Sequence, residues 1–178
     1  MPIKKTFAAL AMVGVVCLSG VHQAVAACNP CSLPMTASIA FDSALGIVKN
    51  ADINFDTVKA ATADTYTIST SGVVSALGGA SHLLGQNGAT AGSITISGSA
   101  TETISISVGG YTASNGDTPS AATCAYNGGG SGSCTIAGAA APGAGKTLLL
   151  GVTVTTTVAG STVNTTATPS FTVTVTYP

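Results

Sequence analysis

The sequence predicts an all-β protein, an immunoglobulin-like antiparallel β-sandwich in a single domain. Short segments rich in β-branched residues recur along the chain, and glycine, asparagine or serine separates them. Within these segments apolar and hydroxyl side chains alternate with a period of two, which places them on opposite faces of a strand. No segment shows the 3.6-residue period of an amphipathic helix, so we expect strands throughout.

The first 26 residues are typical of a secretory signal peptide. Lys4 and Lys5 precede an apolar run at residues 7–18, and residues 24–26 (Ala-Val-Ala) form the small-residue pattern that a signal peptidase reads. Cleavage there leaves residues 27–178, in which no second apolar run is long enough to cross a bilayer. We expect an exported protein of the periplasm, the outer surface or an extracellular fibre.

Cys28 allows a second reading of the same region. Residues 25–28 also resemble a lipobox, in which Cys28 would become the lipidated first residue of a lipoprotein. Cleavage after Ala26 leaves four cysteines, an even set suited to an oxidising compartment, whereas lipidation of Cys28 leaves three for pairing. Parity favours signal-peptide cleavage, followed by a short Cys/Pro segment at 27–35 and the sandwich domain at 36–178.

Eight segments of that domain carry the strand pattern. The predicted strands are residues 39–41, 53–55, 66–69, 73–77, 93–97, 103–108, 147–158 and 170–177. In three of them the apolar residues fall on one face with serine or threonine opposite. These faces are the predicted core: Ile94 and Ile96; Ile104, Ile106 and Val108; Leu148, Leu150, Val152 and Val154.

The last strand is the first candidate for an assembly element. Phe171, Val173, Val175 and Tyr177 alternate with threonines up to the last residue but one. Lysines usually protect sheet edges from other chains, and this strand has none. Either loops cover the edges, or a strand from a neighbouring subunit or a chaperone fills an edge or groove.

A second assembly candidate precedes the domain's other strands. In residues 35–41, Met35, Ala37, Ile39 and Phe41 alternate as the apolar face of a strand would. These residues could be a donor strand for another subunit or the domain's own first strand. We favour the second reading slightly, because few residues precede them to serve as a flexible extension.

The four cysteines after the signal peptide form two local pairs. Cys124 and Cys134 flank a glycine-rich loop, and a disulfide between them would staple a hairpin. Cys28 and Cys31 form a C-x-x-C, which for zinc lacks a second such pair and for redox chemistry lacks a strand-to-helix setting. Pairing of Cys28 or Cys31 with the hairpin cysteines is also open.

Composition argues against nucleic acid binding and against catalysis. The part after the signal peptide has three lysines, six acidic residues and no arginine, too little positive charge for a nucleic acid partner. Its single histidine, His82, has no paired carboxylates nearby in sequence, whereas acid–base catalysis needs two positioned groups. Residues 142–147 mimic the end of a phosphate loop but lack its first glycine. We expect no enzyme, cofactor or metal site.

Residues 43–58, 91–98 and 171–177 resemble segments of a family of exported proteobacterial proteins, domain of unknown function 4402. Residues 43–58 contain the Lys-x-Ala-Asp step of that family, and Ile53-Asn54-Phe55-Asp56 stands where its Leu-x-Phe-Gly signature would be. Residues 91–98 are similar to its Ala-Gly-x-hydrophobic-x-hydrophobic-x-Gly strand, and residues 171–177 to its closing strand.

The resemblance implies a sandwich related to bacterial adhesin and pilin domains, including spore-coat-U-like subunits, without enzyme activity. In such pilins an extension of the next subunit closes the sandwich beside the C-terminal strand, whose penultimate residue is aromatic, as Tyr177 is. The pilin glycine about fourteen residues from the end is absent here. Two functions follow as hypotheses: a fimbria-like surface subunit, whose partners are copies of itself, other subunits or a periplasmic chaperone, and a monomeric envelope binding module.

Overall fold

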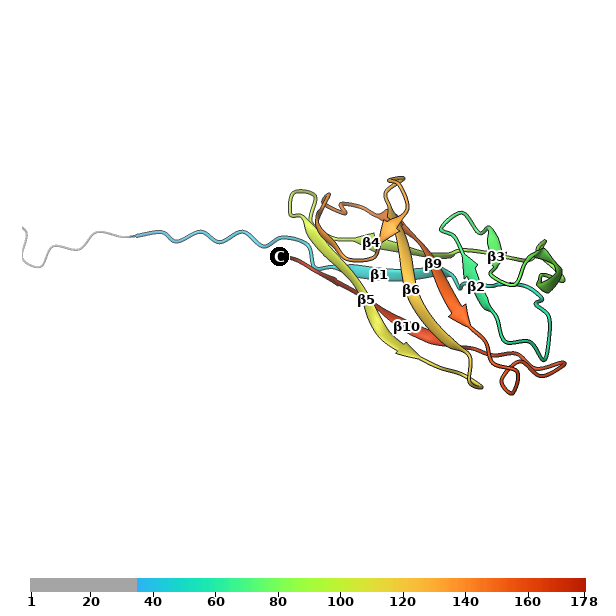
Figure 1. Ribbon diagram of the computed structural model, residues 1–178. Coiled ribbons are helices and arrows are strands. Elements are labelled where there is room, and N and C mark those ends of the chain that lie inside the picture. The colour runs from blue at the N-terminus through green and yellow to red at the C-terminus, as the bar shows by residue number, and fades with distance from the viewer. Residues whose placement is uncertain (1–34) are drawn as a thin grey trace, which may run out of the picture. The chain divides into compact units, whose positions relative to one another are not determined.

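The computed structural model describes residues 35–178, and residues 40–178 form one compact unit. Residues 35–39 are exposed and have no regular secondary structure. The described chain is a two-sheet antiparallel sandwich, which confirms the predicted all-β fold (Figure 1). Its elements are β1 (Gly46–Ala51), β2 (Thr65–Ile68), β3 (Val74–Ala76), the single 3-10 turn η1 (Ala80–His82), β4 (Gly92–Ser97), β5 (Ile104–Thr112), β6 (Thr118–Tyr126), β7 (Gly132–Ser133), β8 (Ile136–Ala139), β9 (Lys146–Thr155) and β10 (Ser170–Thr176).

The ten-residue strand β9 is the centre of the larger sheet. β4 pairs with its first half and β2 with its second half, while β6 pairs along its other edge. β1 extends the sheet beyond β4, β3 extends it beyond β2, and β7 pairs with β6. Gly151 lies where the neighbour of β9 changes from β4 to β2, and a Cβ there would lie 2.3 Å from the Ile68 carbonyl oxygen. Only glycine allows the backbones to approach so closely.

The smaller sheet has the order β10-β5-β8, and the core lies between the two sheets. The predicted core faces are confirmed: the inward residues of β4, β9 and the first part of β5 are buried, and Val108 is half-buried against them. Alternation placed them correctly because it depends only on the pleat of each strand.

The outer face of the larger sheet carries paired hydroxyl groups. The Thr67 and Thr153 hydroxyls are hydrogen-bonded at 3.0 Å, and those of Thr65 and Thr155 lie 3.4 Å apart. Cross-strand threonine pairs of this kind stabilise a sheet without charge. They form a hydroxyl ladder between β2 and β9.

Two predicted strands are wrong. Residues 39–41 form no strand, and Ile39 and Phe41 are 77% and 86% exposed, so the interpretation of this segment as the domain's own first strand is also wrong. The first strand begins at Gly46 instead, because residues 46–51 occupy the edge of β4. At 53–55 only Asn54 makes a bridge, to Thr90, and Asp56 with φ 59° ends the extended backbone.

Candidate functional site

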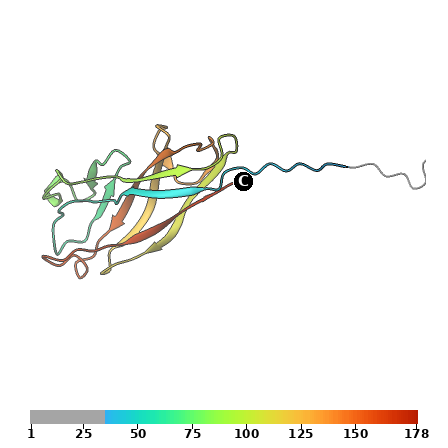
Figure 2. The same cartoon turned by 180° about the vertical axis from the view of Figure 1, so that it is seen from behind.

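An open groove of about 990 Å³ lies between the edge strands β1 and β10. Among residues 35–178, β1 pairs only with β4 and β10 only with β5, so each strand leaves one edge unpaired. Both edges border the groove, with Lys49 and Ala51 on one side and Phe171 and Val173 on the other. The ribbons of β1 and β10 diverge in both views from the end that carries the C-terminus (Figures 1 and 2). The two sheets are therefore not joined on this side by a backbone ladder.

The floor of the groove is the hydrophobic core itself. Ile94 of β4 and three alternate residues of β9, Leu150, Val152 and Val154, line it with apolar side chains. Since alternate residues of a strand share a face, the same period that builds the core also builds the floor. An extended apolar chain that entered here would complete the core.

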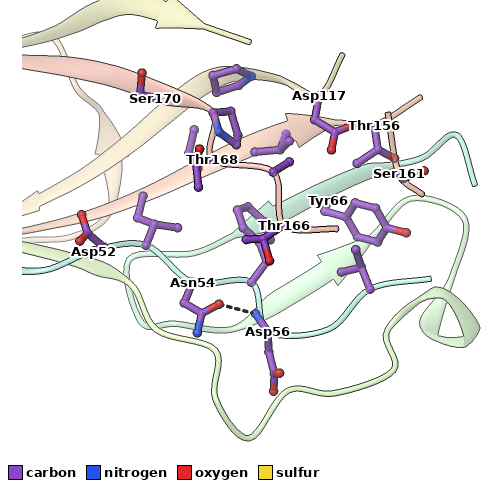
Figure 3. A pocket seen from close by; sticks show the side chains of 18 of the residues that line it. Asp52, Asn54, Asp56, Tyr66, Asp117, Thr156, Ser161, Thr166, Thr168 and Ser170 are labelled. Atoms are coloured by element: carbon purple, nitrogen blue, oxygen red, sulfur yellow. Dashed lines mark hydrogen bonds between the residues drawn. The ribbon is translucent and has the colours of Figure 1, made fainter. Parts of the chain in front are cut away.

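One end of the groove is polar, and Tyr66, Asp117, Thr156 and Ser161 line it (Figure 3). The Tyr66 side chain is 2% exposed, and its hydroxyl is buried without a hydrogen-bond partner. Burial raises the pKa of the Tyr66 hydroxyl, and the negative charges of Asp64 and Asp117 raise it further. A buried hydroxyl without a partner is rare, because its desolvation costs about 1–3 kcal/mol.

The rim near Asn54 is held by local hydrogen bonds. The Asn54 side chain accepts the Asp56 N–H at 2.9 Å and donates to the Gly88 carbonyl at 3.1 Å (Figure 3). The Asp56 carboxylate accepts the Gly88 N–H at 2.9 Å. These carboxylate and amide groups are used to hold the loops together. On the exposed side of the rim Lys49 forms an ion pair with Asp52 at 2.8 Å.

Beyond the groove, the end of β10 is bonded to the chain just before β1. The Tyr177 hydroxyl donates to the Ser43 carbonyl and accepts the Ser99 N–H, both at 2.7 Å. The fully buried Ser99 hydroxyl donates to the Asp42 carboxylate. This bond, with the Ser43 N–H, lowers the pKa of the Asp42 carboxyl. We call Asp42, Ser43, Ser99 and Tyr177 the latch.

The predicted assembly residues of β10 lie together. Phe171, Val173, Val175 and Tyr177 are half-buried and pack against the core, and Phe171 and Val173 line the groove. Of the two predicted assembly residues before β1, Phe41 is exposed and does not line the groove, and Ile39 is exposed.

The predicted disulfide between Cys124 and Cys134 is present, with Cα atoms 4.9 Å apart, and it closes the β6–β7 hairpin as expected. Cys28 and Cys31 lie outside the described residues. The hairpin does not line the groove.

His82 is part of a structural contact. Its Nδ1 lies 2.7 Å from an Asp64 carboxylate oxygen, and both side chains are largely buried. This contact ties η1 to the start of β2. Within residues 35–178 no three histidine, cysteine or acidic side chains gather as a metal site would require. In the same range no helix is long and apolar enough to cross a membrane.

Sequence reasoning did not identify Tyr66, Asp117, Ser99 or Asp42 as site residues. Each lies in an ordinary strand or turn sequence, and the groove arises only when strands from both ends of the chain meet. No family model, curated protein or solved structure matches this chain.

Proposed function

We propose that this chain is a non-catalytic, exported structural or adhesive protein, a fimbria-like surface subunit that assembles by β-strand addition. The observation that carries the proposal is the groove between β1 and β10, which has an unpaired strand edge on each side and an apolar floor. An added strand would pair with backbone groups at these edges and cover the floor. Such pairing gives affinity, and the apolar floor selects the side chains.

The composition of the edges supports this proposal. Thr172, Thr174 and Thr176 are the exposed side chains of β10 after Ser170, and none carries charge. On β1, Ile47 and Val48 are 47% and 59% exposed. Natural monomers usually protect such edges with lysine, proline or a bulge. β1 carries Lys49 with a register shift beside it, and β10 has a register shift between Ser170 and Thr172. From Val173 to Thr176, β10 has no lysine, proline or register shift.

Residues 35–41, which we call the arm, match the floor of the groove in pattern. Seven extended residues span about 23 Å, which exceeds the part of β10 that lines the groove, residues 170–173. The arm's apolar residues alternate, as insertion over an apolar floor requires, and Met35, Ile39 and Phe41 are 86%, 77% and 86% exposed. The arm of a second copy is therefore the proposed occupant, and other surface subunits or a periplasmic chaperone could offer similar strands.

Deletion of residues 27–41 tests the proposal. We expect the mature chain to form oligomers that resist detergent, since inserted strands dissociate slowly, and the deletion variant to be a folded monomer. Light scattering after size exclusion and circular dichroism measure both properties. Equal oligomerisation of the two proteins would refute assembly through the arm.

Point variants provide a matched control for the deletion. Ile39→Asp places a charge on the apolar face of the arm, whereas Ser38→Asp places the same charge on the opposite face. Only the first should abolish the oligomer. If both variants weaken the oligomer equally, the added charge weakens it regardless of which face of the arm carries it, and strand insertion does not explain the loss.

One observation favours the second candidate, a monomeric envelope binding module. The groove has the volume of a small-molecule site, and the Tyr66 hydroxyl at its polar end lacks a partner. The two functions differ in oligomeric state. A mature chain that is a monodisperse monomer at all concentrations, with or without residues 27–41, would favour the module.

A further inference from the structure

The latch closes the region between β10 and β1 that the groove leaves free. Ser170, Phe171 and Val173 line the groove, whereas Val175 and Tyr177 do not. Where the groove stops, Tyr177 bridges to the carbonyl of Ser43, three residues before β1 begins. The latch therefore holds β10 to the chain before β1 at the end where the chain enters the sandwich, outside the lining of the groove.

Ser99 makes the latch rigid. Its hydroxyl accepts the N–H groups of Thr101 at 3.1 Å and Glu102 at 2.9 Å, and donates to Asp42. Its own N–H is bonded to Tyr177. The Ser99 side chain is fully buried, whereas Asp42, Ser43 and the bond between Tyr177 and Ser43 are exposed, so the cost of an unmade bond falls on Ser99. Asp42 and Ser43 are thus both fixed to the turn between β4 and β5.

A chain could fill its own groove only by folding back just before β1. The arm ends at Phe41 and β1 begins at Gly46, so residues 42–45 would have to form the loop of a hairpin. Four residues are enough for such a loop. The loop would have to pass between β1 and β10, where the Ser43 carbonyl is bonded to Tyr177. It would break the hydrogen bond between Asp42 and Ser99 and the one between Ser43 and Tyr177.

We propose that the latch prevents a chain from inserting its own arm and so reserves the groove for the arm of a second copy. This inference rests on the proposed function and adds the device that selects exchange between subunits over self-closure. The arm directly adjoins the latch in sequence, and its last residue, Phe41, is exposed rather than buried in the groove. The latch restrains residues 42–45, which connect the arm to β1, and it leaves the groove itself unchanged.

Photo-cross-linking of a mixture of isotopically light and heavy chains tests this inference on the full mature chain. A photo-reactive phenylalanine analogue replaces Phe41, and light and heavy chains are refolded together before irradiation. Mass spectrometry then maps the adducts. Adducts between chains contain mixed isotopes in the statistical share, and adducts within a chain never do. With the latch intact we expect the adducts in the groove to form between chains and therefore to contain mixed isotopes.

Tyr177→Phe removes the hydroxyl and both of its hydrogen bonds. We expect the share of adducts within one chain to rise about tenfold to thirtyfold, as the loss of two ordinary hydrogen bonds predicts. Gly98→Ala is the second variant, because its Cβ would lie 2.5 Å from the Tyr177 hydroxyl and displace it. Tyr126→Phe is the control: its hydroxyl donates to the Ala140 carbonyl at 3.0 Å, and it does not line the groove.

The possible results separate the inference from the proposed function. Groove adducts within single chains when the latch is intact would overturn the inference. It would also be overturned if neither Tyr177→Phe nor Gly98→Ala changed the share of mixed-isotope adducts. In both cases strand insertion would stand. If no adduct maps to the groove in any background, insertion of the arm is refuted and the inference falls with it.

Discussion

Reduction of the Cys124–Cys134 disulfide is the perturbation whose cost follows most directly from the structure. The two cysteines are 10 residues apart, and the chain-entropy relation for a loop of this length gives a loss of about 2.7 kcal/mol at 25 °C. β7 pairs with β6 through only two residue pairs, so little else holds the hairpin closed. For a domain of this size the loss lowers Tm by about 5–11 °C.

Urea unfolding followed by circular dichroism measures this loss in residues 27–178 with Cys28→Ser and Cys31→Ser, a chain in which Cys124 and Cys134 are the only cysteines. The unfolding midpoint should fall on reduction, and Cys134→Ala should reproduce most of the fall and be insensitive to reductant. Because both cysteines are buried, Cys134→Ala adds a small cavity loss. A midpoint that does not move on reduction would show that loop closure is not what the disulfide contributes.

Three further predictions concern single side chains. Gly151→Ala should destabilise the fold by about 1–3 kcal/mol in urea unfolding, because the new Cβ meets backbone, whereas Gly109→Ala, with open space around it, should cost far less. Burial raises the pKa of the Asp64 carboxyl, but hydrogen bonds from His82 and two backbone N–H groups outweigh it and lower the pKa. The resulting stability is present above the ordinary aspartate pKa and lost as pH falls through the lowered one, so His82→Ala should reduce the acid-dependent part of Tm. Tyr66→Phe should leave stability unchanged or raise it by up to about 1 kcal/mol in thermal melts, since it removes a hydroxyl without a partner; a clear loss would reveal a bound partner there.

The predicted core was correct where the information is local. Ile104 and Ile106 are buried because alternation within one strand fixes which side chains share a face. The same alternation at Ile39 and Phe41 shows only that the segment can be extended. Whether an extended segment pairs depends on a free neighbouring edge, which alternation within the segment does not report.

β6 was missed for the opposite reason. It contains Pro119 and Ala121, the latter at φ 44°, and its register with β9 shifts between Ser120 and Thr123. Such a bulged, alanine-containing segment has weak strand propensity, and it becomes a strand because β9 offers a long edge. Tertiary pairing outweighs propensity there.

The groove and the latch were beyond sequence reasoning because they join distant segments. β1 and β10 come from opposite ends of the described chain, and Ser99 stands midway between them. Tyr177 was singled out through its resemblance to a pilin-like end, but its contacts with Ser43 and Ser99 had no local signal. Contacts of this kind follow from topology.

The hydroxyl ladder between β2 and β9 has a consequence for the environments in which the protein keeps its properties. Salt screens attraction and repulsion between charges over about 8–10 Å, but it hardly affects hydrogen bonds between threonine hydroxyls and water. A surface that is hydrated through threonine, with 6% charged residues in the whole sequence, offers ions little to act on. We therefore expect the contribution of the hydroxyl ladder to the pairing of β2 with β9 to depend little on ionic strength.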